Sequence, residues 1–199
     1  MSLFYAPQPV VTLPPPAHPL DLADAKRFLR LENTDQEDGD ILDMIAAAAE
    51  YLTRAAESTL VHTMWISQLD AFPACNVIAL PYPPVVQVQI EYFDGDGVTQ
   101  VFNEDNYILR QTGQSLSTIV LDPSASWPAT ESRAAAVSIS YTAGYGANAD
   151  AMPARVRHAM RLLVRHFYDN RDAATPAGNK ALEYSLQSLI GTFATGRVY

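Results

Sequence analysis

The chain has a single cysteine and few basic residues for its length. Of its 199 residues, 13 are lysine or arginine and 22 are aspartate or glutamate, so the formal net charge is −9. One cysteine, Cys75, excludes an internal disulfide and a zinc site built from several cysteines. The chain also lacks the excess of basic residues that holds nucleic-acid phosphates or anionic membranes, so tight DNA binding is not expected.

Long apolar runs are missing as well. No run approaches the ~20 residues that span a bilayer, and the N-terminal residues do not combine a basic region with a long apolar core. We therefore expect a protein made and kept in a reducing, cytoplasm-like space, with no membrane partner.

Motifs of catalysis are absent too. No motif pairs a nucleophile with a general base, and Gly144-Tyr145-Gly146 lacks the lysine of a Walker loop. His158 and His166 lie eight residues apart on one predicted helix, too far to bind one ion without a third element. We expect no catalytic residue, no cofactor and no metal site. A small hydrolase with an unrecognised carboxylate pair stays an alternative.

What the chain does contain is an ordered series of segments. Residues 1–19 hold six prolines and predict an extended arm. Apolar residues at helical spacing predict helices from residue 20 to about 31, from Asp38 or Asp40 to about residue 57 and from Pro153 to 171, and a last amphipathic segment at 181–190. Alternating β-branched and aromatic residues predict antiparallel strands, with an Asp-Gly hairpin turn at 94–97. These strands cover residues 63–69, 85–93, 98–102, 118–121 and 136–141.

These segments together predict an α+β fold. Residues 20–60 and 150–190 form a helical bundle, and an antiparallel β-rich insertion over 61–149 lies between the second and third main helices. Residues 191–199 form a C-terminal tail.

Charge is distributed unevenly along the chain. Residues 1–60 hold ten acidic and four basic residues, residues 61–149 eight and two, and residues 150–199 four and seven. Opposed patches favour head-to-tail contact between copies. The predicted subunit interface joins Arg157, Arg161 and Arg165 to Asp35, Glu37 and Asp38 of a neighbouring copy, and Arg161→Glu is expected to weaken assembly and leave folding intact. In the alternative interpretation the arginines are solvated or paired within the chain.

The last amphipathic segment also admits two interpretations. Its apolar residues are Leu182, Leu186, Leu189, Ile190 and Phe193. They either pack back on the chain's own core or, after a polar linker at residues 172–179, reach a partner as a helix in a groove. We favour the partner.

The order of these segments resembles the tailed-phage head–tail connector, or adaptor, family, which includes proteins of gene transfer agents. The likeness spans about residues 20–171, and its motifs mark a fold and carry no reactive group. They are Leu20 to Arg30, the acidic loop followed by Ile41 to Leu52, Ile78 to Pro84, Tyr141 to Gly146 and His166 to Arg171.

The resemblance implies a structural, non-enzymatic role. Such proteins form a ring, commonly of twelve copies, beneath the portal at the head–tail junction of a virion or virus-like particle made in the bacterial host cytoplasm. The ring passes DNA without tight binding and receives a tail-side stopper or terminator protein. The implied portal-binding residues are Leu182, Leu186, Leu189, Ile190, Phe193 and Tyr199. Another tail or baseplate component stays an alternative.

Overall fold

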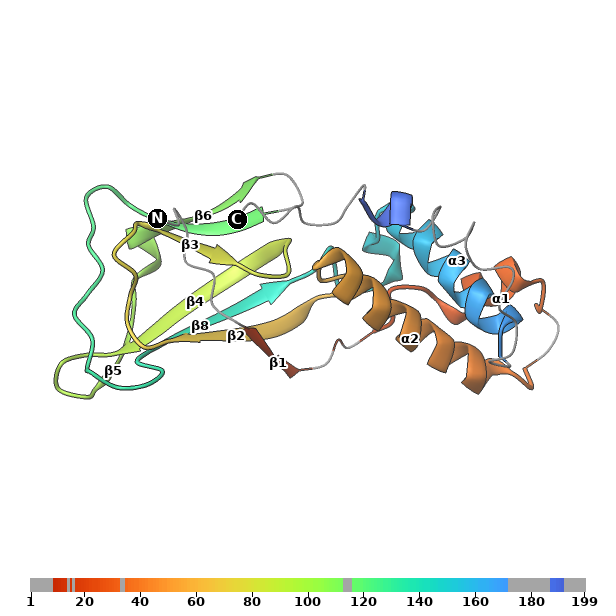
Figure 1. Cartoon of the computed structure of the whole chain (residues 1–199), viewed down its shortest axis with the longest axis horizontal. Coiled ribbons are helices and arrows are strands. Elements are labelled where there is room, and N and C mark those ends of the chain that lie inside the picture. Colours follow the sequence, from red (N-terminus) through yellow and green to blue (C-terminus); the bar gives the residue numbers. More distant parts are fainter. Residues whose placement is uncertain are drawn as a thin grey trace. The chain divides into compact units, whose positions relative to one another are not determined.

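The computed structural model describes residues 9–13, 15, 17–32, 35–112, 116–171 and 187–191. Its described part contains α-helices and two antiparallel sheets, which confirms the predicted α+β class (Figure 1). The chain divides into two compact units. Thr63–Gly144 together with Pro9–Leu13 form the β unit, and Pro16–His62 together with Tyr145–Ala194 form the helical unit.

The helical unit contains the three predicted main helices. They are α1 (Leu22–Leu29), α2 (Asp38–Ala56) and α3 (Ala154–Asp169). α1 and α2 both end at a residue in the left-handed conformation, Arg30 with φ 64° and Glu57 with φ 49°. The backbone N–H of each turns back to carbonyls of the last helical turn, which satisfies groups that a helix end otherwise leaves without a partner. A further helical turn lies at residues 187–191.

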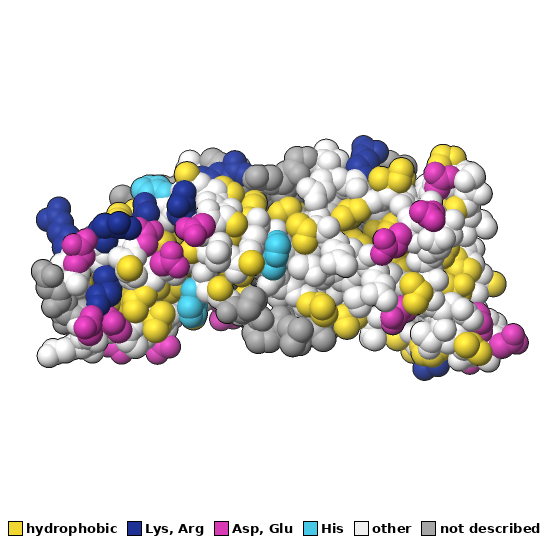
Figure 2. Space-filling model, turned by 180° about the vertical axis from the view of Figure 1, so that it is seen from behind, with side chains coloured by type: hydrophobic (Ala, Val, Ile, Leu, Met, Phe, Trp, Pro, Cys, Tyr) yellow, Lys and Arg dark blue, Asp and Glu magenta, His cyan; other side chains and the backbone are white. Residues whose placement is uncertain are grey.

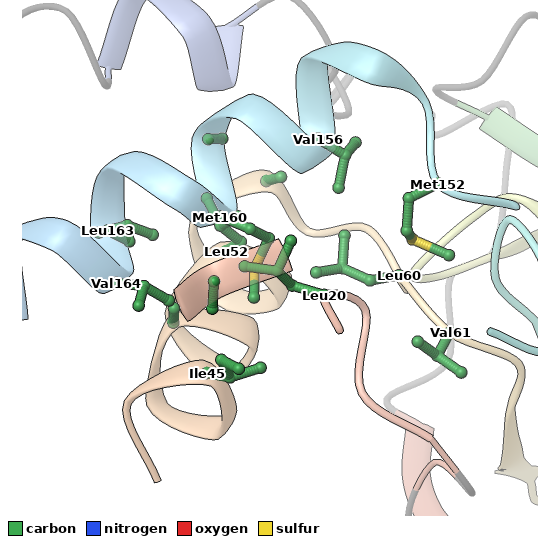
Figure 3. Packing of buried hydrophobic residues seen from close by; sticks show 14 of the residues in the cluster. Leu20, Ile45, Leu52, Leu60, Val61, Met152, Val156, Met160, Leu163 and Val164 are labelled. Atoms are coloured by element: carbon green, nitrogen blue, oxygen red, sulfur yellow. The ribbon is translucent and has the colours of Figure 1, made fainter. Parts of the chain in front are cut away.

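The core of the helical unit lies between α2 and α3 and receives residues from the segments before and after them. Met160 and Val164 of α3 pack with Ile45 and Leu52 of α2, and each of the four is at most 1% exposed (Figure 3). Ala48, which is also fully buried, leaves room for the close approach of the helices. Apolar burial of this kind is the main stabilising contribution to such a unit.

The β unit is built from two antiparallel sheets. The five-stranded sheet has the order β1 (Pro9–Leu13), β2 (Thr63–Leu69), β8 (Val137–Ala143), β4 (Val85–Phe93) and β5 (Thr99–Val101). The three-stranded sheet has the order β3 (Val77–Leu80), β7 (Leu116–Leu121) and β6 (Tyr107–Thr112). All pairs are antiparallel, and β2, β4, β5, β7 and β8 confirm the predicted strands.

A second core fills the space between the two sheets. The alternating buried positions of β2, β4 and β8 meet those of β3, β6 and β7 there. Trp65 stacks on Tyr82 with ring centroids 4.5 Å apart, and the buried Tyr141 hydroxyl donates to the Pro81 carbonyl at 3.1 Å. Polar groups also join the sheets, because the backbone N–H of Val85 on β4 donates to Ser117 Oγ on β7 at 3.1 Å.

Candidate functional site: the charged surface of the helical unit

The helical unit carries most of the chain's basic residues. Figure 2 shows basic and acidic side chains interspersed over one face of this unit, on the left of that view. The stretch 63–144 of the β unit has only two basic residues, Arg110 and Arg133. The six residues predicted as a subunit interface all lie in the helical unit. Their partners within the chain determine which of these charges are available to a neighbouring copy.

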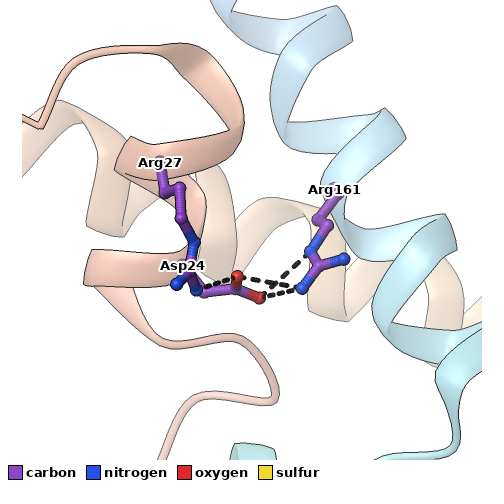
Figure 4. A network of polar contacts seen from close by, with 3 residues as sticks. All are labelled: Asp24, Arg27 and Arg161. Atoms are coloured by element: carbon purple, nitrogen blue, oxygen red, sulfur yellow. Dashed lines mark hydrogen bonds and ion pairs between the residues drawn. The ribbon is translucent and has the colours of Figure 1, made fainter.

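Arg161 of α3 binds Asp24 of α1. Its Nε donates to Asp24 Oδ2 at 3.0 Å, and its terminal nitrogen Nη2 lies 2.9 Å from Oδ1 and 2.6 Å from Oδ2 (Figure 4). Arg27, one turn along α1, donates to the same Oδ1 at 2.7 Å. The Asp24 side chain is 15% exposed and that of Arg161 32% exposed, so solvent screens this pair less than a surface pair. The planar fork of arginine suits this two-point contact.

The local environment shifts the acidity of Asp24. Burial disfavours its charged form, but the hydrogen bonds from Arg161 and Arg27, with the charges of both, outweigh burial and hold the Asp24 pKa below its ordinary value. Asp24 is therefore an ionised link between α1 and α3 at neutral pH.

The other two predicted arginines differ in their surroundings. Arg165 pairs with Asp169 one turn later on α3, at 2.6 Å, with both side chains nearly half exposed. Arg157 is half-buried and has no ion pair within the described part of the chain. The alternative of pairing within the chain therefore describes Arg161 and Arg165, and Arg157 keeps a free charge among the described residues.

The acidic loop is also engaged within the helical unit. Lys26 Nζ lies 2.7 Å from Asp35 Oδ1 and 2.8 Å from Asp38 Oδ1, and the Lys26 side chain is only 10% exposed. Lys26 donates hydrogen bonds to the carboxylates of Asp35 and Asp38, which raise the Lys26 pKa, and the bond to Asp35 lowers the Asp35 pKa. This buried lysine was not among the predicted site residues, since one lysine on an amphipathic helix does not reveal its partners.

A second contact that sequence reasoning missed involves Glu37. Arg171, just beyond α3, donates to Glu37 Oε2 at 2.8 Å and lies over the Tyr168 ring, with its guanidinium carbon 4.2 Å from the ring centre. Hydrogen bonds from Arg171 and from the Tyr168 hydroxyl lower the Glu37 pKa. The contact holds the start of α2 against the end of α3. In the sequence, this contact is indicated only by the motif from His166 to Arg171 at the end of the third helix.

The six predicted interface residues are thus not brought together with one another. Asp35 and Asp38 bind Lys26, Glu37 binds Arg171, and Arg161 and Arg165 bind other acids of the same chain. Contact with a neighbouring copy stays a prediction, and it would require these groups to exchange or share partners. Arg157 has no ion pair among the described residues, so it could bind a neighbouring copy without breaking one.

The predicted portal-binding residues are described only in part. Ile190 is 7% exposed within the core of the helical unit, and Leu189 packs against that core, as the alternative interpretation expected for this segment. Leu182, Leu186, Phe193 and Tyr199 lie outside the described residues. Portal binding by the six stays a prediction.

The described residues contain no group of three or more histidine, cysteine or acidic side chains placed to hold a metal ion. None of their helices is both long enough and apolar enough to cross a membrane. The Cys75 thiol is half-buried and donates to the Val77 carbonyl at 3.2 Å. The Asp94 carboxylate in the predicted hairpin accepts the backbone N–H groups of Asp96 and Val98, each at 3.0 Å, as turn geometry requires.

Comparison with known proteins gives matches at the level of three-dimensional structure. No protein-family model matches the chain, and no curated protein sequence matches it. Solved structures do match over nearly its whole length. A chain of "Neck of empty GTA particle computed with C6 symmetry" has a TM-score of 0.80 and 23% identity, covering 96% of this chain and 97% of that one.

This chain has the fold of a gene transfer agent neck protein. A chain of "Virion of native gene transfer agent (GTA) particle" matches with a TM-score of 0.78 and 23% identity. Another, from "Neck of native GTA particle computed with C12 symmetry", has a TM-score of 0.71 and 21% identity, and each of the two matches covers 96% of this chain and 97% of the other. The resemblance predicted from the sequence is thereby confirmed for the fold. The match includes both units, because the uncovered share is far smaller than either.

Proposed function

We propose that this chain is a structural adaptor subunit in the neck of a gene transfer agent or phage-like particle. The observation that carries the proposal is the fold match over 96% of the chain to chains of GTA necks and virions. In this role, copies form a ring of twelve beneath the portal and connect the capsid to the tail. The C6 and C12 symmetry of two matched necks supports such a ring.

In this proposal the two units have separate tasks. Residues 20–60 and 150–190 form one helical bundle, and the β-rich insertion between its second and third helices supplies further contact surface. The bundle meets the portal, and the ring's outer surfaces receive a stopper or terminator protein on the tail side. No step of catalysis is involved.

Charge supports passage of DNA without tight binding. A chain of net charge −9 repels phosphate, and arginines already bound to carboxylates of their own chain are less available to a duplex. A DNA-binding experiment with the ring at low salt tests this part. We expect weak retention, and affinity in the range of a specific DNA-binding protein would contradict it.

Mass measurement with and without the portal tests the role itself. The purified full-length chain is mixed with the portal complex of the same particle, and the products are measured by mass photometry and imaged by cryo-electron microscopy. We expect a ring of twelve copies on the portal. A chain that stays monomeric beside the portal contradicts the role. Hydrolytic turnover by the pure chain would favour the hydrolase, and binding to a baseplate but not the portal would favour another tail component.

Portal binding by the C-terminal segment needs its own variants. Removing residues 181–199 is expected to abolish binding, but that deletion also takes Leu189 and Ile190 out of the helical core. The double variant Leu182→Asp, Leu186→Asp leaves both core residues in place. We expect it to lose portal binding while its melting temperature stays that of the wild type. Retained binding would refute the assignment.

A further inference from the structure

Charged residues are almost excluded from the strands of the β unit. The eight strands among the described residues hold two, Glu91 on β4 and Arg110 on β6. The other charges of Thr63–Gly144 lie in turns, loops and one short 3-10 turn, at Asp70, Asp94, Asp96, Glu104, Asp105, Asp122, Glu131 and Arg133. The strand faces are therefore the places where two copies of this acidic unit approach with the least like-charge repulsion.

Glu91 lies on the outer face of the five-stranded sheet. The register places it in one row with Ser138 and Gln68, and it also pairs with Val101, which is 61% exposed. The inward positions of these strands are buried in the core between the sheets, so this row faces away from it. Uncharged side chains complete the face, including Met64, Ile66, Gln87, Gln89, Ser140 and Thr142.

Arg110 lies on the outer face of the three-stranded sheet. The register aligns it with Ala79 and with Thr118, which is only 4% exposed, while the adjoining row is Ile108, Val120 and Val77. Ile108 is 60% exposed, although it belongs to a row of three aliphatic residues. An aliphatic row with one arginine beside it has the composition of an interface core, where arginine is enriched and other charges are depleted.

The two outer faces are complementary in charge. Each holds one strand charge, of opposite sign, and neither Glu91 nor Arg110 makes an ion pair within the described part of the chain. The Glu91 carboxylate accepts only a hydrogen bond from Gln89 Nε2, at 3.1 Å, among those described. Because the faces lie on opposite sides of a common core, a contact between them is head-to-tail and propagates from copy to copy.

We propose that the five-stranded face of one copy docks on the three-stranded face of the next, with Glu91 bound to Arg110 of the partner subunit. This contact rests on the proposed ring and names one of its repeating interfaces. Arginine and carboxylate form a charge-assisted pair at the centre of a largely uncharged contact, where little solvent screens it. The pair also sets the direction of the ring. Two five-stranded faces would bring Glu91 against Glu91, and two three-stranded faces would bring Arg110 against Arg110.

Charge reversal tests the pairing directly. Glu91→Arg and Arg110→Glu each place like charges opposite one another, and each is expected to lower the fraction of chain in portal-bound rings about tenfold or more. The double variant restores the pair in reversed order and is expected to recover most of the ring. Circular dichroism and melting temperature should stay unchanged in all three, since both side chains lie on outer faces. Undiminished rings in the single variants, or no recovery in the double variant, overturn the proposal.

Cross-linking in the assembled ring gives an independent readout with Glu91 and Arg110 intact. In a Cys75→Ser background, copies with Gln89→Cys are mixed with copies carrying Thr112→Cys, each two residues from the proposed pair on the same face. A short bismaleimide is used because an arginine–glutamate pair holds its backbones farther apart than a disulfide spans.

We expect covalent dimers in the mixture and none in either variant alone. A ring that shows no link in the mixture, or links between two Gln89→Cys copies, overturns this contact and leaves the adaptor role standing. A chain that never forms a ring with the portal overturns both.

Discussion

Asp24 binds the guanidinium of Arg161 through both carboxylate oxygens, across 137 residues of sequence. The contact joins α1, which precedes the β unit in the chain, to α3, which follows it. Asp24 also accepts a hydrogen bond from Arg27, so one carboxylate binds two arginines. Arg161 therefore contributes to the fold of the helical unit through this contact.

Removing the charge of Arg161 is expected to destabilise the helical unit. Arg161→Gln leaves Asp24 partly buried with Arg27 alone and should lower the free energy of unfolding by about 1–2 kcal/mol, measured by urea denaturation. Arg165→Gln is the matched control, and its exposed i,i+4 pair with Asp169 should cost about 0.5 kcal/mol or less. Equal losses would contradict this ranking. Arg161→Glu, expected from sequence to leave folding intact, is now predicted to weaken it further.

Acid should remove the contribution of Asp24. The pKa of Asp24 is lower in the folded chain than its ordinary value, so its stabilisation is fully present above about pH 4 and is lost as pH falls through the folded-state value. The difference in free energy of unfolding between wild type and Asp24→Asn should therefore shrink from about pH 6 to about pH 3. Urea titrations of both proteins at each pH measure it. A difference that does not change with pH would contradict the prediction.

Two adjacent residues of α2 should differ greatly in their effect on stability. Leu52 is 0% exposed in the helical core, and Leu52→Ala should cost about 2–5 kcal/mol through lost burial and the cavity left behind. Tyr51 is 46% exposed, and Tyr51→Ala should cost under about 1 kcal/mol. Chemical denaturation measures the free energy of unfolding of both variants. Similar losses would contradict the assignment of Leu52 to the buried face of α2 and of Tyr51 to its exposed face.

Trp127 anchors the long loop between β7 and β8. Its indole N–H donates to the Cys75 carbonyl at 3.1 Å, and its ring stacks on Phe72 at a centroid distance of 4.8 Å. Trp127→Phe keeps an aromatic ring and loses the hydrogen bond, so about 1 kcal/mol of stability should be lost, while Trp127→Ala should lose about 3 kcal/mol. Thermal unfolding gives the order. A phenylalanine variant as unstable as the alanine variant would show that the hydrogen bond dominates.

Regular hydrophobic spacing allowed much of the fold to be predicted. β2 and β4 have the predicted bounds, and the buried and exposed residues of β2 alternate throughout as in a half-buried strand, while those of β4 are interrupted by a register shift between Val85 and Gln87. α2 and α3 were predicted from their apolar stripes, and α3 buries Val156, Met160, Leu163 and Val164. Phe167, one turn further along the helix, is only partly buried.

Three strands were missed, each for a local reason. β1 lies within the proline-containing segment that indicated an extended arm, and it is at the edge of its sheet, where proline is tolerated. β3 is short and ends directly before the proline-rich segment 81–84, whose prolines cannot donate to a sheet ladder. β6 has apolar Tyr107, Ile108 and Leu109 in succession, which hides the alternation.

The partners of the charged residues could not be predicted from spacing. Helical periodicity indicates which face of α3 carries Arg161, but it contains no information on which distant residue meets that face. Asp24 and Lys26 lie on α1, whose sequence was interpreted only for its apolar side. Long-range pairs depend on how the helices pack, and that arrangement is set by apolar contacts rather than by the charges themselves.

The order of the units along the chain has a consequence for synthesis. α1 and α2 leave the ribosome before the strands from β2 to β8, and α3 leaves after them. The nascent β unit has nearly all its strands available while α1 and α2 still lack the helix that covers their apolar side. We therefore expect the strands to fold first and chaperones for apolar surfaces to bind translation intermediates that stop short of Ala154.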